Sequence, residues 1–479
     1  MCEKKMETVK KTIIEALKPW ALGFLSDSRY RDKMDAKIEK KIRRITNITL
    51  GKELGVSSTT KLDDIPYNSY ELYKKYYEKP VEGHFLYDIN DYVTTLTSGT
   101  MGRPKKYLLP KTALKNNLSN TGLSSILVAT HDGEKITFEF GDIAYTNVPG
   151  GNQISAHLTE IAKKGNFGFV KNCPDPNLPF QTKVDYFVNN YKNIDMAFMT
   201  VTSLLDEIYP RIGEPFHLKA FMTQDASSRV FKDEIKKITG SYPKTTYGST
   251  ETLFATVASI EYPGCYIFDW RVIYPEFLPE ESVLDYNVSI VEEKYDSVKL
   301  DEVEPGERYQ LVATPYLMEM TRYIMPDIME CVDTGDDVLG TDLPVFRYHA
   351  RSDKLMVLHN FTRIAEEELL QVLKEAGIPF VDFTVKKELA GSKEYMRMYL
   401  ELTQSMDTEL VYKKIDDKLT EFDRDWNDLK NFLKYNPLII ELLPKNSFRN
   451  YLYKKHGAPR IERIEMREER LKMLLNNSS

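Results

Sequence analysis

The sequence has little cysteine and no long hydrophobic run. None of its cysteines forms a CxxC pair, and its seven histidines show no ligand spacing, so neither a zinc site nor a disulfide framework is indicated. Residues 9–25 are only partly apolar and are interrupted by Lys18 and Pro19, so they predict an amphipathic helix rather than a signal peptide or a membrane span. We expect a cytoplasmic protein without a membrane partner. The cysteines are Cys2, Cys173, Cys265 and Cys331.

Signatures of two common enzyme classes are also missing. There is no GxxxxGK[ST] segment, so a Walker-type phosphate-binding loop is not implied. There is no GxSxG segment, so a serine-hydrolase nucleophile is unsupported. The formal net charge of −7 and the isoelectric point near 5.7 argue against a nucleic-acid partner, because phosphate binding is driven by clustered Lys and Arg.

The length and patterning of the chain indicate two domains of different class. Its 479 residues, 42% hydrophobic and 29% charged, suit a globular chain. Residues 1–90 predict a helical lead-in, because Ile38, Ile42 and Ile45 recur at spacings of three or four. Short apolar runs alternate with helical stretches in the residues up to 352. Residues 1–352 as a whole therefore predict one α/β domain with helix-flanked sheets. Residues 353–479 predict a small, mobile α+β domain.

The expected elements follow from these patterns. In the first domain we expect strands over 91–97, 135–140, 197–201, 220–223 and 265–272, and helices over 155–164 and 229–239. In the second we expect the order strand, helix, strand, strand, helix over 354–359, 365–376, 383–388, 395–402 and 407–423. This order is typical of an α+β domain and differs from the alternation before it.

A loop rich in glycine and hydroxyl side chains follows the first expected strand. Gly99 and Gly102 allow the backbone to approach phosphate oxygens closely. The hydroxyls of Ser98 and Thr100 can donate to those oxygens, and Lys105 supplies a cation. The loop therefore predicts a phosphate site that is not of the Walker type. Its sequence is Thr97-Ser98-Gly99-Thr100-Met101-Gly102-Arg103-Pro104-Lys105.

The order of residues in this loop closely resembles the phosphate-binding loop of the acyl-adenylate-forming superfamily. A second segment, running from Tyr247 to Glu251, resembles the adenine and magnesium motif of that superfamily. The resemblance implies that Tyr247 lies against adenine, that Thr250 contacts the α-phosphate, and that Glu251 holds Mg²⁺, a cation that prefers oxygen ligands. The further nucleotide-binding residues implied here are Thr246, Gly248 and Ser249.

A strand and loop upstream resemble the edge of the superfamily's adenine pocket. Residues 220–228 read AFMTQDASS, with Asp225, Ala226 and Ser227 at the tip of the loop. The resemblance implies that these three residues bind the nucleotide. The alternative interpretation is a buried strand that ends in a polar turn.

Two aspartates compete for the role of binding the ribose hydroxyls. Asp327 ends the segment Arg-Tyr-Ile-Met-Pro-Asp, which resembles the superfamily's RYxxxD element, although Pro326 stands where glycine is usual. Asp336 ends Thr-Gly-Asp, which resembles the TGD form of the same element. We prefer Asp327, because a strand-like run follows it, but both stay candidates.

The segment Arg351-Ser352-Asp353-Lys354 lies where the composition changes, as expected for the hinge of a mobile domain. The resemblance implies that Arg351 reaches the ribose or the phosphates and that Asp353 absorbs the rotation. An exposed salt-bridge cluster is the alternative. No lysine is clearly placed to assist adenylation, and the candidates are Lys445, Lys454 and Lys455.

Within the superfamily, the chain resembles the acyl-acid amido synthetases related to the plant auxin-conjugating enzymes, and also the phenylacetate–CoA ligases. The resemblance lies in Asp64–Tyr67 before the first motif, in the expected strand pair over 381–402, and in the closing segment from Ser447 to Arg460. That closing segment lacks the family's usual Gln-x-Lys before Pro459-Arg460. We expect residues 140–157 to line the acyl pocket.

The resemblance implies a ligase that uses ATP and Mg²⁺ to activate a small carboxylic acid as its acyl-adenylate. The acyl group would pass to an amine, namely an amino acid. Transfer to CoA stays open, as does a noncatalytic adenylate-binding homologue, because the closing segment departs from the family pattern. The sequence fixes neither the acid nor the oligomeric state.

Overall fold

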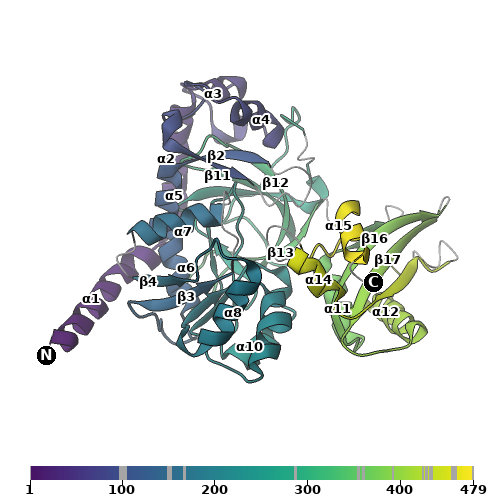
Figure 1. Cartoon of the computed structure of the whole chain (residues 1–479). Helices are drawn as coiled ribbons and strands as arrows, with labels where there is room; N and C mark the ends of the chain where they lie inside the picture. The colour runs from purple at the N-terminus through teal and green to yellow at the C-terminus, as the bar shows by residue number, and fades with distance from the viewer. Residues whose placement is uncertain are drawn as a thin grey trace. The chain divides into compact units, whose positions relative to one another are not determined.

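The chain divides into two compact units, Met1–Tyr348 and His349–Ser479 (Figure 1). The predicted fold class, a large α/β unit followed by a smaller α+β unit, is confirmed. The computed structural model describes residues 2–96, 105–147, 154–165, 169–284, 288–352, 356–358, 362–390, 393–422, 426, 430, 435–454 and 461–476.

The first unit begins with the predicted helical lead-in. The second helix is amphipathic, because Met34, Ile38, Ile42 and Ile45 recur every three or four residues and are all buried. The fourth helix starts after Ser69, whose hydroxyl accepts a hydrogen bond of 3.2 Å from the N–H of Glu71 and so satisfies one exposed donor of the helix end. The helices are α1 (Cys2–Leu22), α2 (Tyr30–Ile45), α3 (Thr49–Glu53) and α4 (Tyr70–Glu78).

A five-stranded parallel sheet with the order β4-β3-β5-β6-β7 forms one core of this unit. Side chains alternate across it: Tyr145 and Phe221 face α8 and α10, whereas Met196 and Ala220 face α1 and α6 (Figure 1). Helices therefore cover both faces, as parallel sheets require. The elements are β3 (Asp142–Thr146), β4 (Val170–Cys173), β5 (Met196–Phe198), β6 (Ala220–Thr223), β7 (Pro243–Thr245), α6 (Leu123–Ala129), α8 (Phe180–Asn190) and α10 (Lys232–Thr239).

A six-stranded sheet with the order β10-β11-β12-β13-β9-β8 forms the other core, and the hairpin β1-β2 belongs to the same hydrophobic cluster. Phe277 and Phe346 stack in this core with ring centroids 4.7 Å apart. Burial on both sides explains the nearly continuous apolar runs of these strands. The strands are β1 (Tyr92–Leu96), β2 (Lys106–Pro110), β8 (Thr256–Ala258), β9 (Tyr266–Phe268), β10 (Ile273–Pro279), β11 (Arg308–Pro315), β12 (Tyr323–Asp333) and β13 (Val345–Arg351).

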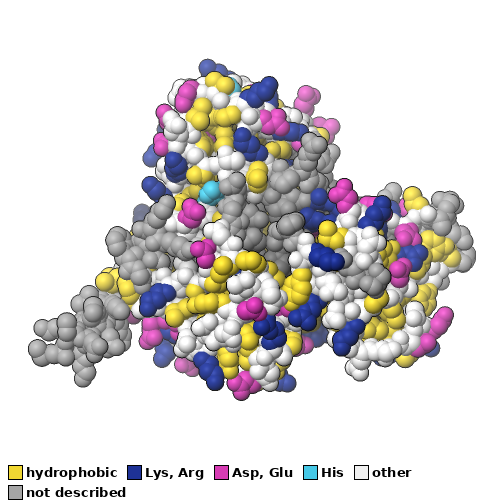
Figure 2. Space-filling view, viewed as in Figure 1, with side chains coloured by type: hydrophobic (Ala, Val, Ile, Leu, Met, Phe, Trp, Pro, Cys, Tyr) yellow, Lys and Arg dark blue, Asp and Glu magenta, His cyan; other side chains and the backbone are white. Residues whose placement is uncertain are grey.

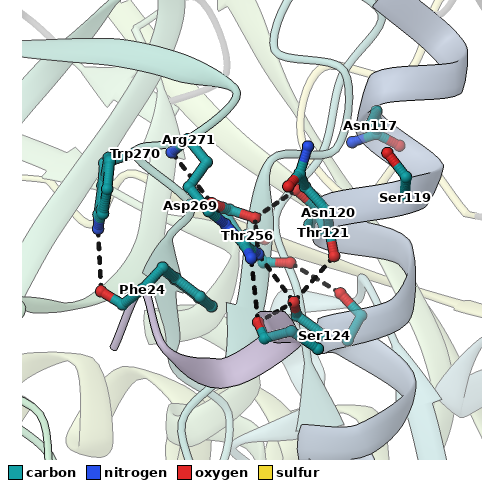
Figure 3. A network of polar contacts seen from close by, with 12 residues as sticks. Phe24, Asn117, Ser119, Asn120, Thr121, Ser124, Thr256, Asp269, Trp270 and Arg271 are labelled. Atoms are coloured by element: carbon teal, nitrogen blue, oxygen red, sulfur yellow. Dashed lines mark hydrogen bonds and ion pairs between the residues drawn. The ribbon is translucent and has the colours of Figure 1, made fainter. Parts of the chain in front are cut away.

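A buried polar network ties the lead-in to α6 and to the segment after β9 (Figure 3). The carboxylate of Asp269, fully buried after β9, accepts hydrogen bonds from Thr121 at 2.7 Å and from the guanidinium of Arg271 at 2.7–2.8 Å. Arg271 also donates to Ser124 at 2.8 Å and to the carbonyl of Ala21, near the end of α1, at 3.1 Å. Every charge in the network has a partner, which is the condition for tolerating a buried ion pair.

The second unit contains the predicted strand, helix, strand, strand, helix order. Its main sheet pairs β16 with β17 antiparallel and β17 with β18 parallel. The sequence patterns missed β15, β18 and the last two helices. The elements are β14 (Met356–Leu358), β15 (Thr362–Ile364), α11 (Glu366–Glu375), β16 (Phe380–Ala390), β17 (Lys393–Leu402), α12 (Thr408–Phe422), β18 (Leu438–Leu443), α14 (Ser447–Lys454) and α15 (Glu468–Asn476).

The strand expected over 135–140 is wrong. This segment makes a single bridge between His131 and Ile136, and the strand begins only at Asp142. The carboxylate of Asp142 accepts a hydrogen bond of 2.9 Å from the N–H of Glu139, and its own N–H donates to the Glu139 carbonyl at 3.1 Å. This local turn uses backbone groups that a strand would need.

Short elements connect the larger ones in the first unit. The α-helices among them are α5 (Lys111–Asn117), α7 (Ile154–Gly165) and α9 (Tyr209–Ile212). The 3-10 and π turns are η1 (Leu62–Asp64), η2 (Ile89–Asp91), η3 (Leu118–Gly122), η4 (Tyr191–Asn193), η5 (Ser203–Ile208), η6 (Ala226–Ser228) and η7 (Glu280–Ser282). The helices expected over 155–164 and 229–239 correspond to α7 and α10.

The surface mixes charges of both signs. On the face in view, Lys and Arg side chains are interspersed with Asp and Glu rather than gathered in one area (Figure 2). Exposed large apolar residues, such as Trp20, Val81 and Leu389, lie far apart in the sequence, and single ones are ordinary on protein surfaces. Among the described residues, no helix has both the length and the apolar character needed to cross a membrane.

Candidate active site

The carboxyl ends of the parallel strands bring several polar loops to one edge of the five-stranded sheet. Asp225 follows β6, and its Oδ2 accepts a hydrogen bond of 2.7 Å from the N–H of Val201, which follows β5. Thr246 follows β7, and its N–H donates to the carbonyl of Thr223 at 3.0 Å. Asp225 and Thr246 therefore lie at the edge where open α/β sheets bind ligands.

The turn after Asp225 is packed closely against the sheet. Ser227 is buried, and the hydroxyls of Ser228 and Thr245 lie 2.8 Å apart. Ala226 belongs to the same turn, η6, but its side chain lies outside the described residues. The polar turn is thus fixed by its own contacts at the end of β6.

A strained turn follows Tyr247. The N–H of Tyr247 donates to the hydroxyl of Thr256 at 2.9 Å, and that hydroxyl donates to the Tyr247 carbonyl at 2.6 Å. Leu253 and Phe254 have φ angles of 54° and 57°, a left-handed conformation that bulky residues rarely adopt and that occurs most often at functional sites. A Cβ atom at Gly248 would lie 2.3 Å from Phe254, so only glycine fits there.

This turn presents Glu251 to two tyrosines from other parts of the chain. The hydroxyl of Tyr107 in β2 donates to Oε1 of Glu251 at 2.5 Å, and the hydroxyl of Tyr323 in β12 lies 3.5 Å from the same oxygen. The two hydroxyl oxygens are 3.0 Å apart. Burial raises the pKa of both tyrosines well above its usual value, so both remain protonated. The neighbouring Thr250 is buried.

The donor set at Glu251 fits a magnesium ion. Mg²⁺ is commonly held by one or two carboxylates together with substrate phosphates rather than by an all-protein cage. Glu251 is one such carboxylate, and none of the described residues donates a hydrogen bond to its Oε2. Within the described ranges there is no group of three or more His, Cys, Asp or Glu that could hold a metal by itself.

Asp327 lies beside Tyr247 at a break in the β11–β12 ladder. The hydroxyl of Tyr247 donates to Oδ2 of Asp327 at 2.7 Å. Gln310 pairs with Ile328 and Val312 with Ile324, so the intervening residues of β12 form a bulge. Bulges often re-aim side chains beside active sites, and the missing N–H of a proline is tolerated in them. The bulge therefore accounts for Pro326 and turns Asp327 toward Tyr247.

Asp336 has a different environment. Its Oδ2 accepts from the hydroxyl of Ser259 at 2.6 Å and from the N–H groups of Ile260 and Glu261 at 2.9 and 3.2 Å. Its Oδ1 accepts from the N–H of Leu339 at 2.9 Å, and the side chain is fully buried. Both oxygens therefore accept hydrogen bonds that hold loops of the protein together, which indicates a structural role for Asp336.

The phosphate-binding loop itself, with Ser98, Gly99, Thr100 and Gly102, lies outside the described residues. Its ends are described: Leu96 and Lys106 are paired in the β1–β2 hairpin, so the loop connects two adjacent strands. The ammonium of Lys105 lies 4.8 Å from the ring centroid of Tyr70. Tyr107, two residues after Lys105, contacts Glu251, so the second end of the loop lies beside the predicted magnesium residue.

Sequence reasoning missed the roles of Tyr107 and Arg322. The only local signal for Tyr107 is its place just after the loop. Arg322 was expected as part of a nucleotide motif, but its guanidinium donates to the carbonyls of Asp63 and Ile65 at 3.1 and 3.0 Å and pairs with Glu276 at 3.0 Å. Arg322 thus anchors the segment before α4 beside the start of β12.

The remaining predicted residues are placed as follows. Arg351 is the last residue of β13 and is partly buried, while Asp353 and Lys455 lie outside the described residues. Lys445 is exposed in the turn after β18, and Lys454 is exposed at the end of α14.

The structure describes only part of the predicted acyl-pocket region. Tyr145 points into the core against Phe187, with ring centroids 4.8 Å apart, so it does not line a pocket. The amide of Asn147, just after β3, donates to the hydroxyl of Ser203 at 2.8 Å. Residues 148–153 lie outside the described part of the chain. The period of two along β3 explains why Tyr145 faces the helices.

Solved structures share this architecture over nearly the whole chain. The acyl acid amido synthetase AtGH3.15 in complex with 2,4-DB has a TM-score of 0.69 at 14% identity, covering 95% of this chain and 95% of that one. 2-Hydroxyisobutyryl-CoA ligase, in the postadenylation state with 2-HIB-AMP, has a TM-score of 0.64 at 13% identity, covering 94% and 92%. The chain has the fold of the adenylate-forming enzymes.

One family model matches part of the chain. Residues 266–347, which contain β9 to β12 and part of β13, match the GH3 family central domain. No curated protein matches the chain by sequence. This match and the shared fold support the resemblance to the acyl-acid amido synthetases noted from the motifs.

Proposed function

We propose that this protein is an ATP-dependent ligase that activates a carboxylic acid as its acyl-adenylate and then transfers the acyl group to an amino acid. One observation carries the proposal: three sequence motifs far apart in the chain meet at one place. Tyr107, just after the phosphate loop, contacts Glu251, and Tyr247 contacts Asp327. A nucleotide would thus find its phosphate, metal, adenine and ribose residues at neighbouring positions.

The residues act in the first half-reaction by binding and orientation. The hydroxyls of Ser98, Thr100 and Thr250 and the cation of Lys105 stabilise charge on the phosphoryl oxygens, while Asp327 accepts from the ribose hydroxyls. Glu251 would hold Mg²⁺, which would supply positive charge to neutralise the phosphates. A carboxylate oxygen of the acid attacks the α-phosphorus in line, and the bond to pyrophosphate breaks.

The second half-reaction needs no side-chain nucleophile. The amine nitrogen of the acceptor attacks the acyl carbon of the mixed anhydride, the bond to AMP breaks, and the amine proton passes to solvent. Holding the two reactants in place makes the reaction effectively unimolecular, which lowers the barrier by several kcal/mol. CoA is the second candidate acceptor, because a CoA ligase shares this fold.

Isotope exchange between pyrophosphate and ATP tests the proposed first step. With Mg²⁺ and a panel of aryl and aliphatic acids, at least one acid is expected to support exchange. The matched control is Glu251→Gln, which keeps the size of the side chain but removes its charge, and which should abolish most of the exchange. AMP binding without exchange for any acid would instead establish a noncatalytic adenylate-binding protein.

A further inference from the structure

The hydroxyl of Tyr107 is placed to hold one oxygen of Glu251. Tyr107 is fully buried, and its hydroxyl donates to Oε1 at 2.5 Å. Tyr323 supports the same oxygen from 3.5 Å and lies 3.0 Å from the Tyr107 hydroxyl. A hydrogen bond to an ionised carboxylate is stronger than one between neutral groups, so this contact sets the direction in which Glu251 points.

The two tyrosines belong to a rigid aromatic cluster. The ring of Tyr107 lies 5.1 Å from that of Tyr70 and 5.6 Å from that of Tyr77. The ring of Tyr323 lies 5.9 Å from that of Tyr73. All five rings are nearly or fully buried, so neither hydroxyl can move far without displacing packed neighbours.

The environment of Glu251 differs from that of a carboxylate with a purely structural role. Asp336 is fully buried and accepts hydrogen bonds on both oxygens. Glu251 is partly exposed, and both tyrosine hydroxyls approach only Oε1. Among the described residues, Oε2 accepts no hydrogen bond, so it is available to a ligand.

We propose that Tyr107, supported by Tyr323, is a positioning residue that fixes Oε1 of Glu251 so that Oε2 faces a divalent cation bound with the nucleotide. This assignment rests on the proposed function. Residues that orient a metal ligand typically change metal affinity about 10–100-fold when they are removed. The same bond also connects the strand that follows the phosphate loop to the metal residue.

The test measures Mn²⁺ binding by electron paramagnetic resonance, with a nonhydrolysable ATP analogue at saturation. Tyr107→Phe is expected to weaken Mn²⁺ binding about tenfold or more. Tyr77→Phe is the matched control, because it removes a hydroxyl without a hydrogen-bond partner from the same cluster, and it should leave Mn²⁺ binding unchanged. AMP affinity without metal should stay normal in both variants.

The outcomes separate the inference from the proposed function. Three results would each overturn the assignment. The first is unchanged Mn²⁺ affinity in Tyr107→Phe, and the second is a loss of AMP affinity in this variant as large as its loss of Mn²⁺ affinity. The third is no Mn²⁺ binding by the wild type. If Tyr107→Phe does not fold, Tyr323→Phe decides it, with a several-fold loss expected. A further outcome is possible. The wild type binds Mn²⁺ with the analogue and Tyr107→Phe does not, but no acid supports exchange between pyrophosphate and ATP. This outcome would keep the assignment of Tyr107 and refute the ligase activity.

Discussion

The hydroxyl of Tyr247 donates a hydrogen bond of 2.7 Å to Oδ2 of Asp327. Tyr247 follows the last parallel strand, whereas Asp327 lies in the bulge of an antiparallel strand. The bond therefore joins the two sheets at the place where the adenine and the ribose are expected. Groups held in place before the ligand binds do not have to be ordered during the reaction.

Asp327→Ala should lower AMP affinity at least about tenfold, because two hydrogen bonds from the ribose to a charged group, worth about 1.5–3 kcal/mol each, are lost. Calorimetric titration with AMP measures this effect. Asp336→Ala is the matched control: it should bind AMP almost normally but unfold more easily, since four donors lose their acceptor. A large loss of AMP affinity only in Asp336→Ala would move the ribose role to that residue.

The acceptor can be identified by product analysis. With the acid that best supports exchange, addition of amino acids should yield amide faster than addition of CoA yields thioester. This expectation rests on residues 266–347, which match the GH3 family central domain. Mass spectrometry of the two products under equal conditions is the measurement. Faster thioester formation would assign the chain to the CoA-ligase type of chemistry.

Gly248→Ala should destabilise the protein by about 1–3 kcal/mol and weaken nucleotide binding, because its new methyl group would lie 2.3 Å from Phe254. Urea unfolding and AMP titration measure the two effects. Gly122→Ala is a suitable control, since there the nearest atom to the methyl group would belong to the flexible side chain of Leu118, at 3.3 Å, and the backbone oxygen of Asn117 would lie at an ordinary contact distance of 3.9 Å. Equal effects of both substitutions would contradict the close approach seen at Gly248.

Lys41→Met should lower the free energy of unfolding by at least about 1–3 kcal/mol. The buried ammonium of Lys41 donates to the carbonyls of Pro315, Met318 and Met320 at 2.6–2.7 Å, just before Arg322 and β12. Methionine would leave these three acceptors without a donor. Urea unfolding of both proteins at pH 7 gives the difference.

The pH dependence of that difference has a definite sign. Burial lowers the pKa of Lys41 to about 7 from the 10.5 of an ordinary lysine, while Glu319 raises it and Arg44 lowers it further. Between these pH values the unfolded chain binds more protons at this site, so wild-type stability should rise with pH relative to Lys41→Met. Unfolding at pH 7 and pH 9 measures the change. A difference independent of pH would show that the pKa of Lys41 is not lowered.

The sequence alone determined the fold class and the main motifs of this protein. The spacing of apolar residues depends on which side of a helix or strand is buried, and this is a local property of each element. For this reason the sequence predicts the strand over 220–223, which the structure contains. The glycine loop, the segment from Tyr247 to Glu251 and the Arg-Tyr-x-x-x-Asp element were recognisable because they resemble superfamily motifs, in which fixed residue types occur at fixed spacing.

Only the tertiary structure decided which residues face one another. Asp327 and Asp336 both end plausible motifs, but the pairing of β11 with β12 turns one toward Tyr247, and a separate loop surrounds the other. Tyr107 has no spacing signal that links it to Glu251, 144 residues away. Contacts between segments so distant depend on how strands pair and twist across two sheets, and no local pattern of residues encodes that.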